Sequence, residues 1–365
     1  MKSKKILFIA DGLGSGGAER QMVTVAGLLK KNGYDVYVLC YSRGDFYAHV
    51  LLDQAIPIIW KVEKRALPRM LKIRRYIRKG HFNAVISFLE TPNFLNNFAA
   101  IGGHDWKVIT GERSSKDSTF TSRKSKIFLW FHRYCDALVC NSENAKQRWA
   151  QRKPKYASKL HCIYNSVTLG LVHSTYEPRR GEKTNIIVAA SHQYLKNGIG
   201  LIKALNEIDK EERKKIHVDW YGSKVVSGSG SAPYEEVLQF VRENNLESVI
   251  EFHDPTNDIA DRMNQADAVA LFSWLEGLPN TICEGMTLGK PIIMTRVSDY
   301  GILVNENNGF LCDWDNVESI KEALLSLSEL PTETMLRMGK NSKNKAEGLF
   351  SQEAILINWI KLIEY

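Results

Sequence analysis

Phe272-Ser-Trp-Leu-Glu276-Gly-Leu-Pro-Asn-Thr-Ile-Cys-Glu284-Gly-Met-Thr-Leu-Gly-Lys-Pro-Ile-Ile-Met-Thr295 places two glutamates around a turn between a strand and a helix. The pattern predicts a buried strand over 267–272, a short helix over 281–288 that ends at Gly289, and a parallel strand over 291–295. Ligands of parallel α/β sheets bind where such strands end. We therefore expect a binding site with Glu276 on the loop, Glu284 one turn into the helix, and loop amides that donate to ligand oxygens.

Apolar strand patterns occur in two series along the chain. The first covers 5–10, 35–41, 84–88, 107–111, 137–141 and 160–164, and the second covers 185–190, 217–221, 249–252, 267–272 and 291–295. Helical or loop segments alternate with these strands, which is typical of parallel sheets covered by helices. The polar stretch 177–183 is the predicted linker. The sequence therefore predicts an α/β protein with Rossmann-like domains over 1–175 and 184–350.

The composition is that of a soluble globular protein, with 44% hydrophobic and 25% charged residues in 365. No apolar run is long enough to cross a bilayer, and the N-terminus has no signal-peptide pattern, so we expect a cytoplasmic protein. The six cysteines have no metal-binding spacing, which predicts free thiols.

Charge is distributed unevenly between the two halves. Residues 1–168 hold 29 Lys and Arg against 12 Asp and Glu, a net +17, whereas the remainder holds 20 against 29, a net −9. Two basic amphipathic segments, 61–79 and 123–133, suggest an anionic membrane surface as the partner of the first half. The alternatives are a helix that buries its apolar stripe in the core, and a nucleic acid as the anionic partner.

A glycine-rich segment, Asp11-Gly-Leu-Gly-Ser-Gly16-Gly17-Ala-Glu-Arg20, follows the first predicted strand and opens a helix. Such a turn lets the backbone approach a phosphate at the helix N-terminus. The segment also matches the dinucleotide fingerprint, but the second strand ends in Cys40-Tyr-Ser-Arg43 without the expected acidic residue. We therefore disfavour NAD binding.

The run from Glu276 to Pro291, with its two glutamates, resembles the retaining glycosyltransferases of family 4. The resemblance implies the GT-B architecture, in which two Rossmann-like domains with parallel sheets face a central cleft. It implies an N-terminal acceptor-binding domain, a C-terminal nucleotide-sugar-binding domain, and a final helix, 351–365, that crosses back to the N-terminal domain. It also implies a reaction without a metal cofactor, in keeping with the absence of an Asp-x-Asp arrangement at a predicted strand end.

Family roles are carried over residue by residue. The resemblance implies that Glu276 and the residues after it hold the transferred sugar, while Glu284 binds the ribose. Lys196 matches the cation that neutralises the diphosphate, whereas Ser191 stands where an arginine is usual, so Lys196 acts alone or is joined by His192 or by a residue of the other domain. The expected substrate-binding residues are Gly16, Gly17, Ser191, His192, Glu276, Gly277, Leu278, Pro279, Asn280, Thr281 and Glu284.

The acceptor side is less defined. Glu112 and Arg113, after a predicted strand, resemble an acidic and arginine pair of some family members, and with Glu276 and Lys196 they are the expected catalytic residues. Glu90 or Glu112 would orient the acceptor hydroxyl. Phe88-Leu-Glu90 stands where many members have a histidine, so that role is not transferred. The structural alternative is that Glu112 and Arg113 only pair with each other.

The resemblance implies a retaining transferase that moves a hexose or N-acetylhexosamine from a nucleotide-diphosphate sugar to an acceptor hydroxyl, with a UDP-sugar as the expected donor. The expected acceptor is a lipid-linked glycan or oligosaccharide in bacterial polysaccharide assembly, with the enzyme peripheral to the inner face of the cell membrane and no nucleic-acid partner. Three rivals remain open: a GT-B sugar-nucleotide epimerase or hydrolase, a basic nucleic-acid-binding protein, and an NADP oxidoreductase.

Overall fold

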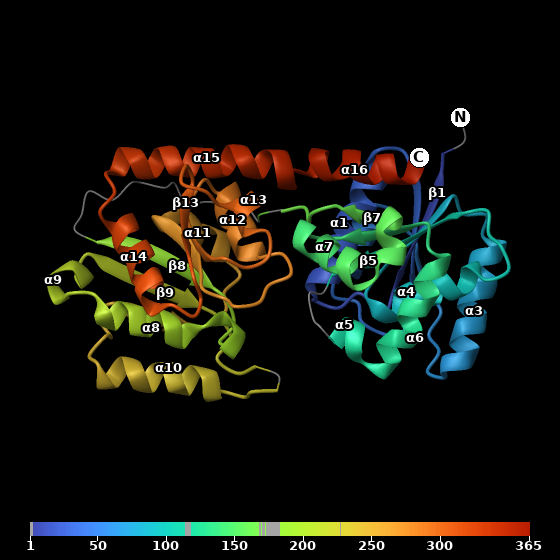
Figure 1. Ribbon diagram of the computed structural model, residues 1–365. Coiled ribbons are helices and arrows are strands. Elements are labelled where there is room, and N and C mark those ends of the chain that lie inside the picture. The colour runs from blue at the N-terminus through green and yellow to red at the C-terminus, as the bar shows by residue number, and fades with distance from the viewer. Residues whose placement is uncertain (1–2, 114–117, 168, 170–171, 173–182, 227) are drawn as a thin grey trace. The chain divides into compact units, whose positions relative to one another are not determined.

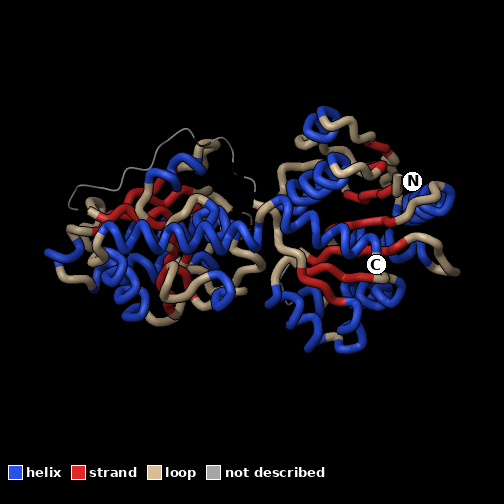
Figure 2. The backbone as a smooth tube through the Cα atoms, turned by 90° about the horizontal axis from the view of Figure 1, so that it is seen from above, coloured by secondary structure: helices blue, strands red, loops and turns tan. Residues whose placement is uncertain are grey.

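The computed structural model describes residues 3–113, 118–167, 169, 172, 183–226 and 228–365. Internal contacts divide the chain into two compact units, the first formed by Met1–Ser166 with Gln352–Tyr365 and the second by Val167–Ser351. Each unit has a parallel sheet with helices on both faces (Figures 1 and 2). The predicted α/β class is therefore confirmed. Of the predicted linker 177–183, only Lys183 lies within the described residues.

The first unit is built on a parallel sheet in the order β3-β2-β1-β4-β5-β6-β7. Its strands are β1 (Lys5–Ala10), β2 (Asp35–Cys40), β3 (Ile58–Trp60), β4 (Ala84–Phe88), β5 (Lys107–Glu112), β6 (Ala137–Cys140) and β7 (Leu160–Cys162). Its helices are α1 (Gly17–Lys31), α2 (Ala48–Asp53), α3 (Ala66–Lys79), α4 (Glu90–Ala100), α5 (Ser118–Thr121), α6 (Arg123–Phe131), α7 (Glu143–Arg152) and α16 (Gln352–Glu364), with 3-10 turns η1 (His132–Tyr134) and η2 (Pro154–Lys159).

The second unit repeats this plan with the order β10-β9-β8-β11-β12-β13. Its strands are β8 (Thr184–Ala189), β9 (Ile216–Tyr221), β10 (Ile250–His253), β11 (Ala268–Leu271), β12 (Ile292–Thr295) and β13 (Gly309–Cys312). Its helices are α8 (Gly198–Glu207), α9 (Lys210–Arg213), α10 (Ala232–Glu243), α11 (Ile259–Gln265), α12 (Asn280–Thr287), α13 (Tyr300–Leu303), α14 (Val317–Ser328) and α15 (Thr332–Phe350), and η3 (Tyr194–Lys196) precedes α8.

The strand order reverses between β8 and β11, which lie side by side in the second sheet. Loops that leave two adjacent strands in opposite directions open a crevice at their carboxyl ends, and ligands of such sheets bind there. Lys196 follows β8 and Glu276 follows β11. The topology therefore places both predicted residues at the reversal point of one sheet.

Strands of the first unit are apolar on both faces because helices cover both. In β1, Phe8 packs into one core cluster and Leu7 into the other, and both are fully buried. Helix α16 supplies part of the cluster around Phe8, through Ile355, Trp359, Leu362 and Ile363. The Trp359 ring lies 5.9 Å from that of Phe88, and Tyr34 donates a hydrogen bond of 2.8 Å to Glu364 at the helix end.

Two strands, β3 and β13, were not predicted from the sequence. Strand β3 has three residues at the sheet edge and follows Pro57, so no period-two pattern develops. Strand β13 begins with Gly309, which indicates a turn when read in sequence. In the structure a Cβ at Gly309 would lie 2.1 Å from the Ile292 carbonyl oxygen, so this glycine permits the close pairing of β12 with β13.

No helix in the described part of the chain has both the length and the apolar composition needed to span a membrane.

Helix α15 contains two glycines in contrasting environments. A Cβ at Gly339 would lie 2.1 Å from the carbonyl oxygen of Gly289, whose φ of +72° ends α12, whereas a Cβ at Gly348 would meet nothing within 4 Å. We expect Gly339→Ala to lower the free energy of unfolding by roughly 1–3 kcal/mol, because a backbone oxygen must move. Gly348→Ala is the matched control and is expected to be neutral or stabilising by up to about 1 kcal/mol. Urea unfolding measures both, and equal effects would contradict the proposed contact.

Lys290 is a buried lysine, 1% exposed, whose Nζ donates to the Asn264 carbonyl oxygen at 2.5 Å. Burial lowers the pKa of Lys290 to about 7, and the charge of nearby Asp267 opposes that shift only in part. Between pH 7 and the ordinary lysine pKa of 10.5, Lys290 thus carries a proton in the unfolded chain that it lacks in the folded chain. The contribution of Lys290 to stability therefore rises with pH across this window.

We expect Lys290→Met to remove this pH dependence. The difference in unfolding free energy between wild type and variant should grow in favour of wild type from pH 7.5 to 9.5, by at most about 1.4 kcal/mol per pH unit. Lys343→Met, at an exposed lysine on α15, is the control and should show no such slope. Urea unfolding at several pH values measures the difference, and a flat profile for Lys290→Met relative to wild type would refute the buried-lysine explanation.

Candidate functional site

The loop between β11 and α12 forms the centre of the candidate site. The chain remains buried through Phe272 and Ser273, reaches the surface at Trp274 and Leu275, and becomes buried again at Leu278. A loop fixed at both ends in this way holds the intervening Glu276 in a defined position. This is the strand, loop and helix arrangement that the sequence predicts.

Glu276 and Lys196 form an ion pair with an N–O distance of 2.5 Å, and their side chains are only 12% and 18% exposed. Ser273 Oγ donates a second hydrogen bond, of 2.7 Å, to the same carboxylate oxygen of Glu276. The structure thus brings together two residues that the sequence analysis predicted separately. Partial burial strengthens the pair, because solvent screens it less than it screens a surface pair.

Lys196 is positioned by the short turn η3 and by the residue that follows it. Asn197 adopts a left-handed conformation, with φ of 57° and ψ of 43°, that ends η3 and starts α8. Its side chain donates to the Trp314 carbonyl oxygen at 2.8 Å. The Trp274 amide donates to the Leu195 carbonyl oxygen at 3.0 Å, which ties the Lys196 turn to the Glu276 loop.

The first turn of α12 is tied to the neighbouring strands. Pro279 stands at the N-cap, one position before the first helical residue. Thr281 Oγ1 donates to the carbonyl oxygen of Ala189, at the end of β8, at 2.7 Å. Ser298 Oγ donates to the Gly277 carbonyl oxygen. The Thr281 hydroxyl is thus used to anchor the helix.

Glu284 lies one turn into α12, as the sequence predicts, on the helix whose N-terminus follows the Glu276 loop. Cys283 and Met286 on the same helix are buried, and Glu284 is partly exposed. The helix therefore presents Glu284 outside the core of the second unit.

His192 packs inside an aromatic cluster. Its side chain is 3% exposed, and its ring lies 5.0 Å from Trp220 in a stacked arrangement and 4.9 Å from Tyr234. Burial, with a further contribution from Lys224, lowers the pKa of His192 to about 4, so the ring is neutral at pH 7. A neutral, buried ring does not supply the positive charge that the missing arginine would, so the structure does not support this role for His192. Sequence position alone does not reveal this packing.

Ser191 is partly exposed and accepts a hydrogen bond of 2.9 Å from Gln193. It lies beside a close backbone approach, since a Cβ at Gly222 would fall 1.8 Å from the Ala190 carbonyl oxygen. The end of β8 is thus fixed against the end of β9.

The glycines at the start of α1 are not required by the backbone. Gly16 caps the helix with φ of −72° and ψ of 157°, values open to any residue. A Cβ at Gly17 would meet nothing within 4 Å, and a Cβ at Gly16 would meet only the flexible end of Glu19. Within the described residues, neither backbone conformation nor packing therefore requires glycine at positions 16 and 17. A ligand that approaches the backbone here would require glycine.

Arg113 is held at the carboxyl end of β5. Its guanidinium lies 4.0 Å from the centre of the Phe88 ring and donates to Asn165 Oδ1 at 2.8 Å. Burial lowers the pKa of Arg113 to about 10, against the charges of neighbouring groups that include Glu112, and the side chain remains charged at pH 7. A partly buried cation supported by an aromatic face and an amide is therefore present where the sequence predicts a functional arginine.

Glu90 begins α4 directly after a strained residue. Leu89 has φ of 73° and ψ of 164°, a conformation that non-glycine residues rarely adopt and that costs of order 1–3 kcal/mol. The Glu90 carboxylate accepts a hydrogen bond of 2.5 Å from Ser125 and lies 3.7 Å from Lys124 Nζ. Strain of this kind persists where surrounding structure enforces it, often at functional sites.

An Asp-x-Asp arrangement does follow a strand, which corrects the sequence analysis. Because β13 was not predicted, Asp313-Trp-Asp315 was not recognised as lying directly after its last residue. The Asp313 carboxylate pairs with Arg296 at 2.8 Å, and Asp315 is exposed. Of the two carboxylates in Asp313-Trp-Asp315, that of Asp313 is thus already engaged in an ion pair with Arg296.

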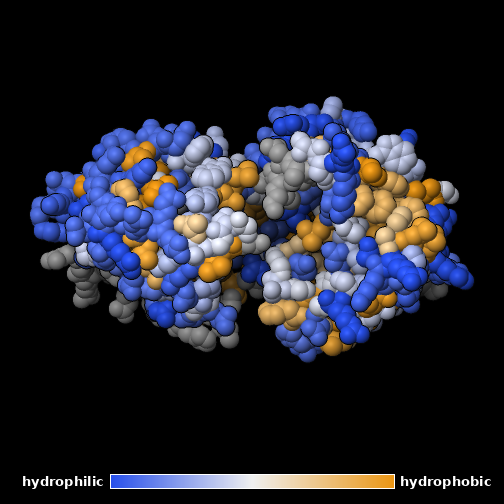
Figure 3. Space-filling model, turned by 90° about the horizontal axis from the view of Figure 1, so that it is seen from below, coloured by the Kyte–Doolittle hydropathy of each residue, from blue (hydrophilic) through white to orange (hydrophobic). Residues whose placement is uncertain are grey.

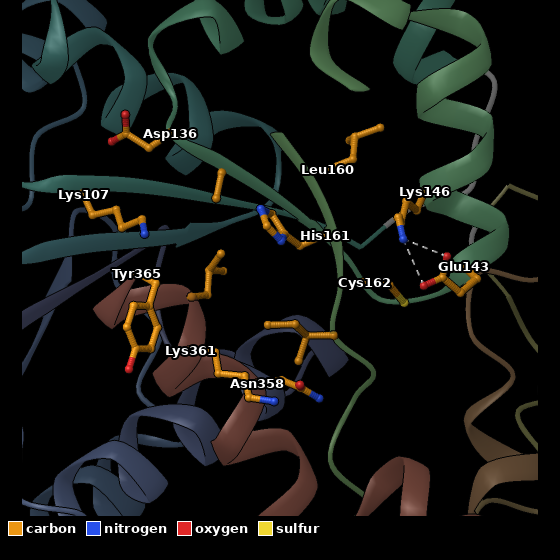
Figure 4. A pocket seen from close by; sticks show the side chains of 13 residues that line it. Lys107, Asp136, Glu143, Lys146, Leu160, His161, Cys162, Asn358, Lys361 and Tyr365 are labelled. Carbon is orange, nitrogen blue, oxygen red and sulfur yellow. Dashed lines mark hydrogen bonds and ion pairs between the residues drawn. The ribbon is translucent and has the colours of Figure 1, made fainter. Parts of the chain in front are cut away.

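A separate cavity of about 650 Å³ lies in the first unit (Figure 4). Strand β7 and helix α16 provide much of its lining, and Glu143 pairs with Lys146 at its edge. None of the site residues predicted from the sequence lines it.

Several site residues were not found from the sequence. Ser273, Ser298 and Trp314 act through hydrogen bonds and packing between segments distant in the chain, and no local pattern marks them. Asn197, directly before a glycine, carries a usable signal, because asparagine tolerates the left-handed conformation that it adopts here.

Known protein families account for most of the chain. Residues 15–171 match the model for Glycosyltransferase Family 4, and residues 175–345 match the model for Glycosyl transferases group 1. An uncharacterized glycosyltransferase of Haemophilus influenzae is 27% identical, covering 98% of this chain and 99% of the relative. A UDP-Gal:alpha-D-GlcNAc-diphosphoundecaprenol alpha-1,3-galactosyltransferase of Escherichia coli is 28% identical, covering 90% and 88%.

Solved structures share the fold. The structure of Anabaena Alr3699/HepE in complex with UDP superposes with a TM-score of 0.84 at 18% identity, covering 99% of each chain. Together with the two family models, this agreement identifies the fold as GT-B. The chain belongs to the glycosyltransferases, with an N-terminal part of Glycosyltransferase Family 4 and a C-terminal part of Glycosyl transferases group 1.

Proposed function

We propose that this glycosyltransferase moves a hexose or N-acetylhexosamine from a UDP-sugar to a hydroxyl of a lipid-linked glycan, with retention of anomeric configuration. The observation that carries the proposal is the Lys196–Glu276 ion pair at the reversal point of the second sheet. A cation beside an acidic residue offers a partner for a diphosphate and an acceptor for sugar hydroxyls within one small volume.

Donor binding would exchange partners within this pair. The diphosphate would compete with Glu276 for Lys196, and Glu276, still bonded to Ser273, would accept hydrogen bonds from the sugar. The amides of Gly277, Leu278 and Asn280 and the glycines at the start of α1 would serve as further donors, and Glu284 would bind the ribose. A cation placed where the leaving diphosphate gains charge lowers the barrier by a few kcal/mol.

In the proposed reaction, the bond between the anomeric carbon and the diphosphate oxygen breaks while the acceptor oxygen bonds to the same face of the sugar. The acceptor proton passes to the departing diphosphate. Glu90 and Glu112 would orient the acceptor hydroxyl, and Arg113, charged and packed against Phe88, would counter acidic groups of the acceptor. The chain's own cations and amides carry the charge in this scheme, and we propose a reaction without a metal ion.

The donor nucleotide and the acceptor class are supported by relatives. The Escherichia coli relative is named for a UDP-galactose donor and a diphosphoundecaprenol acceptor, and the Anabaena structure holds UDP. A diphosphate-linked lipid acceptor also suits the basic first half of this chain.

The surface of helix α3 supports attachment to an anionic membrane. Ile73 and Ile77 face the core, whereas Leu67 and Leu71 are 63% and 52% exposed. Lysines and arginines lie along the same helix, and Figure 3 shows hydrophobic surface beside strongly hydrophilic surface on the first unit. Only part of the apolar stripe of α3 is therefore buried in the core. The exposed leucines are surrounded by lysines and arginines, a combination that suits the interface of an anionic bilayer. We propose peripheral association with the inner face of the cell membrane.

Donor turnover tests the proposed roles. A panel of UDP, GDP and ADP sugars is incubated with the protein in EDTA, with and without a bacterial lipid-linked acceptor extract. We expect acceptor-dependent release of one nucleotide. Lys196→Ala should reduce kcat by roughly 10²- to 10³-fold, because the leaving group loses its cation. Glu284→Ala should chiefly raise the KM for the donor.

Lys203→Ala, at an exposed lysine on α8, is the matched control and should retain wild-type turnover. Nucleotide release without acceptor would favour the hydrolase or epimerase alternative. Failure of calorimetry to detect binding of any sugar nucleotide would reject the donor assignment, and turnover that appears only when Mg²⁺ or Mn²⁺ is restored would reject the metal-free reaction.

Vesicle binding tests the membrane proposal. The double variant Leu67→Ser/Leu71→Ser should bind phosphatidylglycerol vesicles less tightly, because two apolar contacts with the interface are lost. Leu52→Ser, at a leucine of α2 that is 62% exposed, is the control and should bind like wild type. Co-sedimentation measures both, and equal binding by wild type and the double variant would contradict a role for α3.

A further inference from the structure

We propose that His217, Asp219, Glu251 and His253 form a binding site for a transition-metal ion of the zinc class. The four side chains lie on β9 and β10, the outer pair of strands in the second sheet. The Glu276 loop follows β11, which is separated from β9 by β8. The inferred site is thus distinct from the site of sugar transfer and does not depend on the proposed reaction.

Strand register places the four residues on one face of the sheet. His217 and Asp219 are two apart on β9, and Glu251 and His253 are two apart on β10, so each pair points to the same side of its strand. Glu251 pairs in register with Asp219, whereas His253 pairs with Tyr221, so His217 and His253 approach Asp219 from opposite ends of the parallel ladder. The alternate residues of β9, such as Val218, are buried on the opposite face. Because these side chains lie on the same face of adjacent strands, they need little rearrangement to coordinate one ion.

Three of the potential ligands already have their donor atoms close together, and the fourth, His253, contacts Asp219. Asp219 Oδ1 lies 2.8 Å from His253 Nε2 and 3.4 Å from His217 Nε2. Donor atoms of His217, Asp219 and Glu251 all lie within 4.8 Å of one another. Ligands about 2.0–2.2 Å from a tetrahedral zinc ion are separated by roughly 3.3 Å, so the two shortest distances already approach this value.

The donor set determines the class of ion. Two imidazole nitrogens with carboxylate oxygens suit Zn²⁺, and also Co²⁺, Ni²⁺ and Cu²⁺, whereas Mg²⁺ and Ca²⁺ prefer oxygen donors throughout. The side chains of His217, Asp219 and His253 are 22%, 28% and 26% exposed, so an ion can enter from solvent without unfolding the strands. Among the described residues, the Glu251 carboxylate has no hydrogen-bond or ion-pair partner and is available as a further ligand.

Neighbouring groups favour this arrangement. The Tyr221 ring stacks on His253 at 4.3 Å and restricts rotation of the imidazole. Arg262, a cation close enough to influence Tyr221, is paired with Asp258 at 3.1 Å, which reduces repulsion of an incoming metal ion. A bound ion would link two strands at the edge of the sheet, and because it binds only the folded arrangement it would stabilise the second unit.

Zinc titration of the full chain tests the inference. Protein without affinity-tag histidines is treated with EDTA, dialysed and titrated with ZnCl₂ by calorimetry. We expect one equivalent bound per chain, with at least about tenfold weaker binding in His217→Ala and in His253→Ala. His161→Ala, at an exposed histidine on the edge strand β7, is the control and should bind like wild type. Saturating Zn²⁺ should raise the Tm of wild type and of the control but not of the two variants.

Three results would overturn the proposal: no binding by wild type, undiminished binding by both variants, or equal loss in the His161→Ala control. Because a variant can misfold, Cu²⁺ bound to wild type is also measured by electron paramagnetic resonance. Hyperfine splitting from two imidazole nitrogens is expected, and a spectrum without nitrogen ligands would contradict the site. Sugar transfer in EDTA is a separate readout, so failure of the zinc site and failure of the proposed transferase reaction are distinguishable.

Discussion

The ion pair between Lys196 and Glu276 is the interaction on which the candidate donor site depends. Each residue leaves the carboxyl end of a different strand, and only the adjacency of β8 and β11 brings them together. A partly buried carboxylate without its lysine would bear an uncompensated charge, and the lysine without Glu276 would turn toward solvent. The pair therefore keeps both groups in position before a ligand arrives, and any anion that binds Lys196 has to replace an interaction that already exists.

Much of the fold could be predicted from the sequence, because the central strands are covered on both faces and appear as uninterrupted apolar runs. Two of the four edge strands could not: β3 is too short for a period to develop, and β13 begins with Gly309, whose role is to let two backbones approach. Missing β13 had a functional consequence, since the acidic residues after it were then not seen to follow a strand. Both strands that were missed lie at an edge of their sheet, although the edge strands β7 and β10 could be predicted.

The candidate site shows a similar division. Glu276, Glu284 and Lys196 could be predicted because each belongs to a local motif at a strand end or helix start. The supporting hydrogen bonds of Ser273 and Ser298 could not, because their partners are set by folded backbone geometry. The packing of His192 could not be predicted either, since a histidine after a strand gives no sign that its ring lies among Trp220 and Tyr234. Side-chain chemistry is visible in sequence, whereas the direction in which a side chain points is not.

Helix α16 has a consequence for how the chain is made. Its apolar face completes the core around Phe8 and Phe88, yet it leaves the ribosome only after the whole second unit. The second unit is continuous in sequence and can fold as soon as it has emerged. The first unit, although synthesised earlier, has to wait with part of its core open until Trp359 arrives. For this chain the order of synthesis and the order of completion are therefore reversed, which exposes the N-terminal sheet to chaperones and to aggregation for longest.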